Sequence, residues 1–358
     1  MARAFAAGRR VLFVEPRTLH APPPPADGLR GEAPALSFLA LPVLPVNARQ
    51  PLLRSIARLG AQVALLRDAL ARRQGLLLRG KLAALGFREP LLMFGHPEFA
   101  ALREALPGAP LAYDHMDDVL AFGRPSTSRR RELGALVREA ALLSASAERL
   151  AEQLRALGGR EPLLIGNGVE FAHFAPASPP PEPAALAALP HPRCLYVGSV
   201  AEWFDFDLLH AVARALPAAS FPVLGPVRPA LAPRLREAPP NCVYLGAQSY
   251  AELPAWLSHA DAGLIPFQRT PLTAGVDPVK LYEYLAAGLP VIATPFSNEL
   301  AAAAAAGSVS LAADAAGFAA ALGARLAAPP PREQLRALAE PRRWERMLAP
   351  LVRALDAI

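Results

Sequence analysis

Residues 261–294 read DAGLIPFQRT PLTAGVDPVK LYEYLAAGLP VIAT, and they contain a complete strand, loop, helix and second strand. Asp277 predicts a helix N-cap and Pro278 the first helical residue, because these residue types satisfy or lack the exposed N–H groups there. Gly288 predicts the end of the helix. The apolar run Val291–Ala293 then predicts a buried strand. This alternation indicates an α/β protein.

Two charged residues lie on one face of this predicted helix. Lys280 is in its first turn, and Glu283 follows three residues later. A helix N-terminus with one lysine can bind a diphosphate, and a carboxylate one turn further can accept hydrogen bonds from a ribose diol. The chain has 35 arginines but only two lysines, Lys81 and Lys280, which indicates a site that needs a compact ammonium group. A solvated ion pair on a packing helix is the alternative.

The bulk composition fits two domains with full cores, since the chain has 358 residues and is 53% hydrophobic. No run of 18 apolar residues predicts a spanning helix, and no signal-peptide core is found, so a cytoplasmic protein is expected. Cys194 and Cys242 each open a predicted strand and are expected to be buried thiols, not a disulfide. The seven histidines are scattered, so no metal site is predicted.

Positive charge is concentrated in the first half of the chain. Residues 1–176 hold 23 Lys and Arg against 16 Asp and Glu, whereas residues 177–358 hold 14 against 15. A basic half suits an anionic partner such as a lipid diphosphate or bilayer surface, and a solvated arginine-rich surface explains it as well. Nucleic acid is not expected, because the basic residues lack interleaved aromatic residues.

One basic cluster surrounds an apolar segment, Leu76–Leu78 with Leu82 and Leu85. Its members are Arg72, Arg73, Arg79, Lys81 and Arg88. A helix docking peripherally on anionic lipid has this composition, and so does an ordinary amphipathic helix whose leucines face the core.

The first half of the chain alternates predicted strands and helices. The strands are Val11–Val14, Leu36–Leu44, Pro90–Phe94, Leu111–Tyr113 and Pro162–Ile165. A proline-rich loop is expected at Ala21–Pro34, and helices at 51–86, Pro97–Leu106 and Arg129–Leu157, the last broken near Ser144–Ser146 by a buried strand.

A proline-rich stretch, 177–192, predicts the domain linker. Alternation then restarts with strands Cys194–Val197, Pro222–Leu224, Cys242–Leu245, Ala262–Ile265 and Val291–Ala293, and helices 205–216, 229–237, 250–258 and 278–287. Such spacing implies parallel crossovers and doubly wound sheets. The expected domains are 1–176 and 193–338, followed by a helix within 339–358, where Trp344–Leu355 is amphipathic.

Four further motifs accompany the 261–294 stretch. They are Asn167-Gly168-Val169-Glu170 with Phe174, Tyr196-Val197-Gly198-Ser199 with Trp203-Phe204-Asp205, Leu245-Gly246 with Tyr250, Leu253 and Pro254, and Tyr113-Asp114-x-x-Asp117-Asp118 with Phe122. In this order and spacing the chain resembles GT-B glycosyltransferases, above all bacterial enzymes of the teichuronic-acid and xanthan-glucuronosyltransferase type.

The resemblance implies two Rossmann-like doubly wound domains facing across a cleft, and roles for named residues. Gly198 would let the backbone approach a donor diphosphate, Gln248 would contact the base, and Lys280 would neutralise the diphosphate leaving group. Glu283 would hold the ribose. Thr273, with Thr270, would reach sugar hydroxyls, although turn chemistry explains both threonines equally. Trp203 and Asp205 would touch the donor, or Trp203 would pack and Asp205 would cap the helix beginning at 206.

Asp117 is the predicted general base that deprotonates the acceptor hydroxyl, with Asp114 and Asp118 as substitutes. Three carboxylates within five residues should repel one another and raise at least one pKa. Asp114 as a turn or cap residue and Asp118 as a solvated charge are the structural alternatives.

The sequence departs from the family in two places. Gly275 stands where many retaining relatives carry the first glutamate of Glu-x7-Glu, which favours inverting chemistry. Residues 1–10 resemble the end of a first helix, so the family's first strand and Gly-rich loop are expected either upstream or missing from the acceptor site.

The expected activity is transfer of a sugar from a nucleoside-diphosphate donor, with UDP favoured, to a cell-surface polysaccharide or lipid-linked acceptor. The expectation includes no cofactor and no metal, because Lys280 and the helix N-terminus supply positive charge. A nucleotide-sugar epimerase on the same fold and an inactive binding scaffold are the alternatives.

Overall fold

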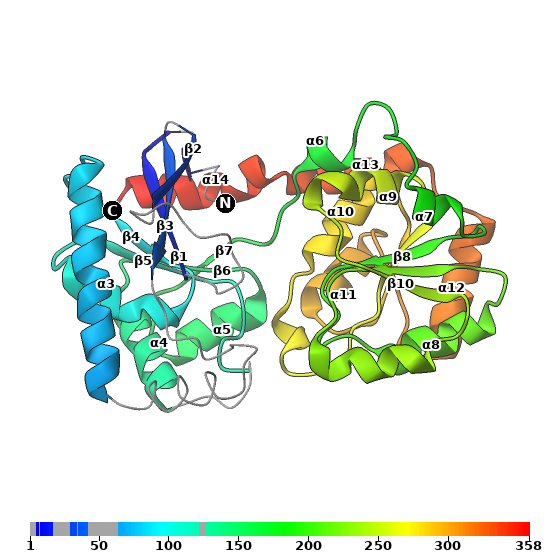
Figure 1. Ribbon diagram of the computed structural model, residues 1–358, viewed down its shortest axis with the longest axis horizontal. Coiled ribbons are helices and arrows are strands. Elements are labelled where there is room, and N and C mark those ends of the chain that lie inside the picture. The colour runs from blue at the N-terminus through cyan, green and yellow to red at the C-terminus, as the bar shows by residue number, and fades with distance from the viewer. Residues whose placement is uncertain (1–4, 7, 17–28, 34, 42–63, 122–126) are drawn as a thin grey trace.

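A computed structural model describes residues 5–6, 8–16, 29–33, 35–41, 64–121 and 127–358. Two α/β domains lie beside each other, and the last helix of the chain returns to the first domain (Figure 1). The N-terminal domain ends near residue 165, and the C-terminal domain follows. The expectation of two α/β domains with parallel sheets is confirmed.

The C-terminal domain contains a six-stranded parallel sheet in the order β10-β9-β8-β11-β12-β13. Its strands are β8 (Cys194–Val197), β9 (Phe221–Leu224), β10 (Cys242–Gly246), β11 (Ala262–Ile265), β12 (Val291–Ala293) and β13 (Ser310–Leu311). Four of these are buried at every position, as expected for strands covered on both faces. Cys194 and Cys242 are buried free thiols, which confirms the prediction.

Helices cover both faces of this sheet. They are α8 (Phe206–Ala215), η2 (Pro229–Glu237), η3 (Tyr250–Glu252), α9 (Leu253–Ser258), η4 (Thr273–Gly275), α10 (Val279–Ala287), α11 (Asn298–Ala305), α12 (Ala315–Ala327) and α13 (Arg332–Ala339), where η denotes a 3₁₀ helix. The predicted helix at 229–237 is a 3₁₀ helix because Pro233 inside it lacks an N–H group.

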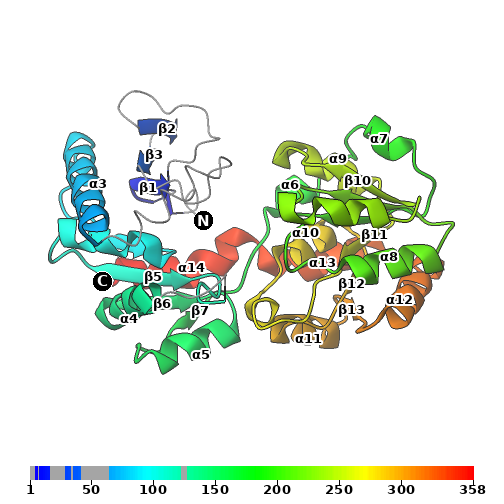
Figure 2. The ribbon, with the colours of Figure 1, turned by 60° about the horizontal axis from the view of Figure 1, so that its bottom comes forward.

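The N-terminal domain has two sheets. Four parallel strands pair in the order β4 (Leu92–Phe94), β5 (Leu111–His115), β6 (Leu142–Ala145) and β7 (Leu163–Leu164). A three-stranded sheet contains β1 (Val11–Pro16), β3 (Leu36–Leu41) and β2 (Leu29–Ala33), with β2 antiparallel to β3 (Figure 2). The predicted loop at Ala21–Pro34 therefore includes a strand.

The helices of this domain are α3 (Ala64–Ala84), η1 (Pro97–Ala105), α4 (Thr127–Glu139) and α5 (Glu148–Ala156). The predicted break near Ser144–Ser146 is confirmed, since β6 separates α4 from α5. Residues 51–63 of the predicted first helix lie outside the described residues. None of the described helices is long and apolar enough to cross a membrane.

The crossing between the domains lies upstream of the predicted linker. Val169 and Phe174 already belong to the core of the C-terminal domain, as does Leu186 of α7 (Ala184–Ala187), while Ile165 packs in the N-terminal domain. The chain therefore crosses at 165–169, and α6 (Phe171–Phe174) follows. The stretch 177–192, which includes α7, packs on the C-terminal domain, whose core buries Leu186.

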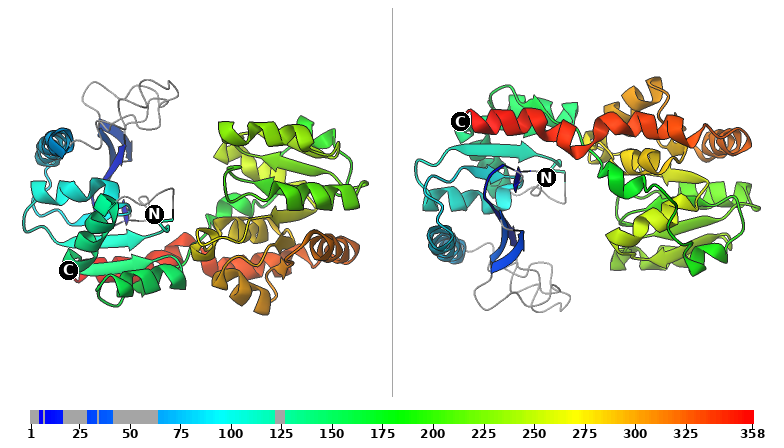
Figure 3. Two further views of the ribbon diagram at one scale, coloured as in Figure 1. Left: turned by 90° about the horizontal axis from the view of Figure 1, so that it is seen from below. Right: turned by 90° about the horizontal axis from the view of Figure 1, so that it is seen from above.

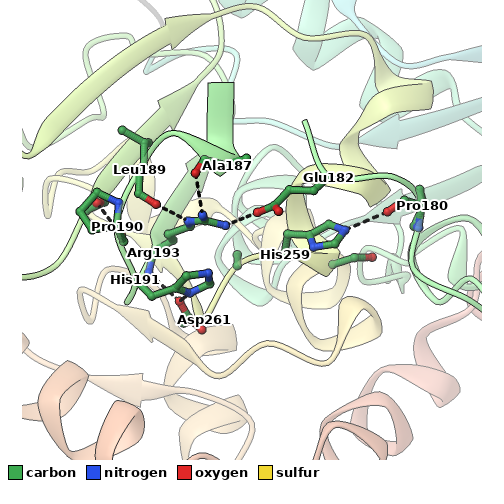
Figure 4. A network of polar contacts seen from close by, with 12 residues as sticks. Pro180, Glu182, Ala187, Leu189, Pro190, His191, Arg193, His259 and Asp261 are labelled. Atoms are coloured by element: carbon green, nitrogen blue, oxygen red, sulfur yellow. Dashed lines mark hydrogen bonds and ion pairs between the residues drawn. The ribbon is translucent and has the colours of Figure 1, made fainter. Parts of the chain in front are cut away.

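Polar contacts fasten this proline-rich stretch to the sheet (Figure 4). The guanidinium of Arg193 binds Glu182 and the carbonyl groups of Leu189 and Ala187. Asp261 accepts hydrogen bonds from His191 and from the backbone N–H of Arg193 at 2.6 and 2.7 Å. These contacts lie at the amino ends of β8 and β11.

The chain crosses back through η5 (Glu340–Arg342), and α14 (Trp344–Asp356) then lies along the N-terminal domain while α13 stays with the C-terminal domain (Figure 3). Leu348, Leu351 and Leu355 of α14 pack with Ala112 and Ile165 of the four-stranded sheet. The predicted amphipathic helix at Trp344–Leu355 is confirmed.

Candidate functional site

The strand order of the C-terminal sheet reverses at β8. This strand pairs with β9 on one side and with β11 on the other, so successive connections run in opposite directions from it. In open α/β sheets, ligands bind outside the carboxyl ends of the strands at such a switch point. Gly198 follows β8 there, and Gly225 follows β9.

Two glycines at this switch point allow the loops after β8 and β9 to approach each other closely. Gly198 has φ 146° and Gly225 has φ 147°, values that favour glycine. A Cβ at Gly225 would lie 2.0 Å from the carbonyl oxygen of Gly198, and one at Gly198 would lie 2.2 Å from Cε of Lys280. Gly198 and Lys280, predicted separately from sequence, are therefore in contact. The sequence motifs do not include Gly225, whose only signal is its position after a buried strand.

Lys280 lies over two aromatic rings. Its Nζ is 5.9 Å from the ring centroid of Tyr196 and 5.5 Å from that of Phe267. Burial lowers the pKa of Lys280, and the nearby Glu283 opposes that shift. Burial likewise raises the pKa of Glu283, where Lys280 opposes the shift and Glu170 adds to it. A bound anion beside Lys280 would favour its charged form.

The helix that carries these residues has no side-chain cap at its N-terminus. Its N-cap is Pro278, and Gly288 ends it with φ 78°, as predicted. Asp277 is not the N-cap, which corrects the prediction: its carboxylate accepts hydrogen bonds from the backbone N–H of Asn167 and from the Tyr282 hydroxyl. The first N–H groups of α10 thus keep their capacity to bind an anion.

Gln248 lies in the loop after β10, and Thr273 is the first residue of η4. The amide of Gln248, after β10, donates to the carbonyl oxygen of Leu245 at 3.1 Å. The Thr273 hydroxyl donates to the carbonyl oxygen of Gln268 at 2.6 Å and is 1% exposed. These contacts favour the turn interpretation of Thr273 over a contact with a sugar.

Asp205 caps a helix and Trp203 packs under its loop, which is the structural alternative to contact with the donor. Asp205 caps α8 by accepting from the backbone N–H of Leu208 at 2.9 Å. The Trp203 indole donates to the carbonyl oxygen of Ser199, and its ring packs near Phe267.

The three carboxylates at the end of β5 have different surroundings. Asp114 is buried and accepts from the Ser144 hydroxyl at 2.7 Å. Asp118 is buried and accepts from two backbone N–H groups and from Gln153, so it is the turn residue, and its interpretation as a solvated charge is wrong. Asp117 alone of the three is exposed.

The sequence predicts that repulsion among the three carboxylates raises at least one pKa, but the pKa rises for another reason. Burial raises the pKa of both Asp114 and Asp117, while the nearby His115 and His96 lower the pKa of Asp117. Mutual repulsion is not among the causes. His115 is buried between the Tyr113 hydroxyl and Gln153. The two histidines were missed because they lie on adjacent strand ends, which only the pairing of β4 with β5 reveals.

Gly275 faces the N-terminal domain. A Cβ there would lie 3.1 Å from Cδ2 of Leu150 and 3.9 Å from Cδ of Arg149, so residues of α5 occupy the space that a longer side chain would need. In the described part of the chain, no group of three or more His, Cys, Asp or Glu residues is arranged to hold a metal ion.

Comparison with known proteins agrees with this geometry. Residues 191–327 match the family model of group 1 glycosyl transferases. A Bacillus subtilis protein, TuaH, assigned to teichuronic acid biosynthesis as a glycosyltransferase, is 29% identical over 139 residues, which is 38% of this chain. The match spans 35% of the length of that relative.

Solved structures share the fold across both domains. Sucrose-phosphate synthase from Thermosynechococcus elongatus aligns with a TM-score of 0.75 and 18% identity, covering 99% of this chain and 92% of its own. Anabaena HepE in complex with UDP aligns with a TM-score of 0.63 and 15% identity, covering 90% and 86%. At these identities the likeness shows the fold.

Proposed function

We propose a reaction for this chain from the premise that it is a GT-B protein of the group 1 glycosyltransferase family. The chain transfers a sugar from a nucleoside-diphosphate donor, with UDP as the nucleotide, to a hydroxyl group of a glycan or lipid-linked acceptor. The acceptor belongs to a cell-surface polysaccharide pathway in this proposal, which the TuaH match supports. The HepE complexes with UDP and UDP-glucose support the choice of donor.

One observation carries the proposal: Lys280 lies against Gly198 at the switch point, beside the uncapped start of α10. A diphosphate there would receive N–H groups, the positive end of the helix dipole and one ammonium group. Together these groups stabilise the charge that develops on the leaving diphosphate, so the residues present suffice without a metal. Glu283, one turn further along α10, is the partner of the ribose, and Gln248 is the partner of the base.

Asp117 is the base in this proposal. It is the exposed carboxylate of its group, and its raised pKa suits a residue that accepts a proton from an acceptor hydroxyl. The hydroxyl then attacks the anomeric carbon, and the nucleoside diphosphate leaves. Gly275 in place of the first family glutamate favours inversion at that carbon.

The proposal also includes a cytoplasmic location with peripheral docking on an anionic membrane. Leu76 and Leu77 of α3 are 62% and 40% exposed, beside the exposed Arg73 and Arg79, while Leu78 is buried in the core. The helix thus combines a core-facing side with an exposed apolar and basic side.

The test is incubation of the purified chain with UDP-sugars, with and without oligosaccharide or lipid-linked acceptors. Release of UDP that depends on an acceptor, with a glycosylated product by mass spectrometry, is the expected result. Conversion of one UDP-sugar into another without acceptor would favour the epimerase, and nucleotide-sugar binding without any product would favour the scaffold. The anomeric configuration of the product, measured by NMR, tests inversion.

A further inference from the structure

The start of α10 is bound to the crossing between the two domains through a single buried side chain. Asp277 is 2% exposed and lies two positions before Val279, the first residue of α10. Its Oδ2 accepts the backbone N–H of Asn167 at 2.7 Å, and its backbone carbonyl oxygen accepts the Asn167 amide at 2.6 Å. Its Oδ1 accepts the Tyr282 hydroxyl at 2.6 Å. The crossing segment and the helix therefore share one carboxylate.

The returning segment meets the same carboxylate. Nη1 of Arg342 lies 3.9 Å from Oδ2 of Asp277, and its guanidinium lies over the Tyr282 ring, 4.7 Å from the centroid. The two crossings also bind each other, since the Val169 N–H donates to the Arg342 carbonyl oxygen at 2.8 Å and the Trp344 N–H to that of Val169 at 3.2 Å.

Glycines allow this close approach. A Cβ at Gly166 would lie 2.9 Å from Oδ2 of Asp277 and 2.8 Å from Nη1 of Arg342. A Cβ at Gly168 would lie 2.8 Å from the Arg342 carbonyl oxygen. Both crossings and the start of α10 are packed without room for a further methyl group.

We propose that Asp277 is a positioning residue that couples the donor helix to the interdomain crossing, and so aligns a bound donor with Asp117 of the other domain. The carboxylate does not cap α10, and the helix start stays available for the diphosphate while its position is fixed by Asn167 and Tyr282. Donor affinity depends on Lys280 and the helix N–H groups. Turnover depends also on the relative placement of the two domains, which this carboxylate holds.

The test variant is Asp277→Asn. An amide can still accept from the Asn167 N–H, but it must reverse the hydrogen bond with the Tyr282 hydroxyl, and it removes the negative charge that faces Arg342 at 3.9 Å. We expect kcat to fall by about 10- to 100-fold, because a small misplacement of reacting groups has an effect of that order. The Kd for UDP should stay within about threefold of that of the parent, because the groups that bind the diphosphate are intact.

Asp261→Asn is the matched control. Asp261 also accepts one backbone N–H and one side-chain donor, but it lies at the amino end of β11, away from the crossings (Figure 4). It should lower the melting temperature without lowering kcat. Tyr282→Phe, which removes one donor and keeps the carboxylate, is the second variant should Asp277→Asn not fold; its kcat should fall by about threefold with the Kd for UDP unchanged.

Hydrogen exchange separates this proposal from the proposed function on which its kinetic readout rests. In the protein without ligand, amides at 165–169 and 340–344 should exchange about tenfold faster in Asp277→Asn than in the parent, and at the parent rate in Asp261→Asn. If the parent protein does not bind UDP, the proposed function is refuted. The exchange rates then decide by themselves whether Asp277 couples α10 to the crossings. Unchanged exchange, an equal fall of kcat in the control, or a loss confined to UDP affinity would each overturn the role of Asp277.

Discussion

At the scale of single residues, the proposed donor site depends on Lys280, because this cation lies against Gly198 at the switch point. In Lys280→Ala, loss of a charge-assisted contact to the diphosphate should cost about 1.5–3 kcal/mol, or roughly 10- to 100-fold in UDP affinity by calorimetry. The melting temperature should not fall, because burial already disfavours this charge.

The control for this prediction is Lys81→Ala, which removes the other lysine of the chain, in α3. Its UDP affinity should equal that of the parent. Unaltered UDP binding in Lys280→Ala would refute the donor site at α10.

Asp117 should act on rate and not on donor affinity. A general base contributes about 10²- to 10⁴-fold, so Asp117→Asn should lower kcat by that order and leave the Kd of the UDP-sugar nearly unchanged. Asp118→Asn should instead destabilise the protein, because Asp118 accepts three hydrogen bonds in its turn. Full activity of Asp117→Asn, with loss in Asp114→Asn, would assign the base to Asp114.

The sequence predicts residues whose chemistry is local better than residues whose role depends on tertiary contacts. Gly288 was predicted correctly as the residue that ends its helix, and the cap was one of the two roles expected for Asp205, because these roles need only the neighbouring backbone. Asp277 was predicted as an N-cap on the same logic, but Asn167, 110 positions away, binds its carboxylate. His96 and Gly225 were missed for the same reason, since strand pairing brings them to the site.

At the scale of elements, the buried strands of the C-terminal sheet were predictable because runs of apolar residues alternate with helices of regular length. The domain boundary was not, because prolines at 177–192 resemble a linker whether or not the stretch packs on a core. The crossing at 165–169 has no linker-like composition, and only its contacts with the start of α14 and with Asp277 before α10 reveal its place between the domains.

The C-terminal helix α14 should stabilise the N-terminal domain, although it follows the C-terminal domain in sequence. Leu351 is fully buried against the four-stranded sheet, so Leu351→Ala should lower the free energy of unfolding of that domain by about 2–5 kcal/mol. Urea unfolding followed by hydrogen exchange in β5 and β8 measures each domain separately. Arg353→Ala, an exposed change in the same helix, is the control, and an effect on β8 alone would contradict this packing.

At the scale of the whole molecule, the asymmetry of charge bears on the proposed docking of the protein on an anionic membrane. The basic excess lies in residues 1–176, and α3 presents Leu76 and Leu77 beside exposed arginines at one end of the molecule (Figure 1). The chain should therefore sediment with vesicles containing phosphatidylglycerol at low salt. Binding should weaken as salt rises, because these charges are screened over about 10 Å at 0.1 M.

Charge reversal tests which face of the molecule binds the vesicles. Arg72, Arg73 and Arg79 changed together to Glu should abolish sedimentation, because each basic residue near the headgroups contributes about 1 kcal/mol. The same change in net charge at Arg214, Arg228 and Arg236, which are exposed on the C-terminal domain, should leave most of the binding in place. Equal loss in both triple variants would mean that net charge drives the association. Equal binding of the parent to neutral and anionic vesicles would exclude an electrostatic role for α3, and the leucines of that helix would then have no lipid partner to account for their exposure.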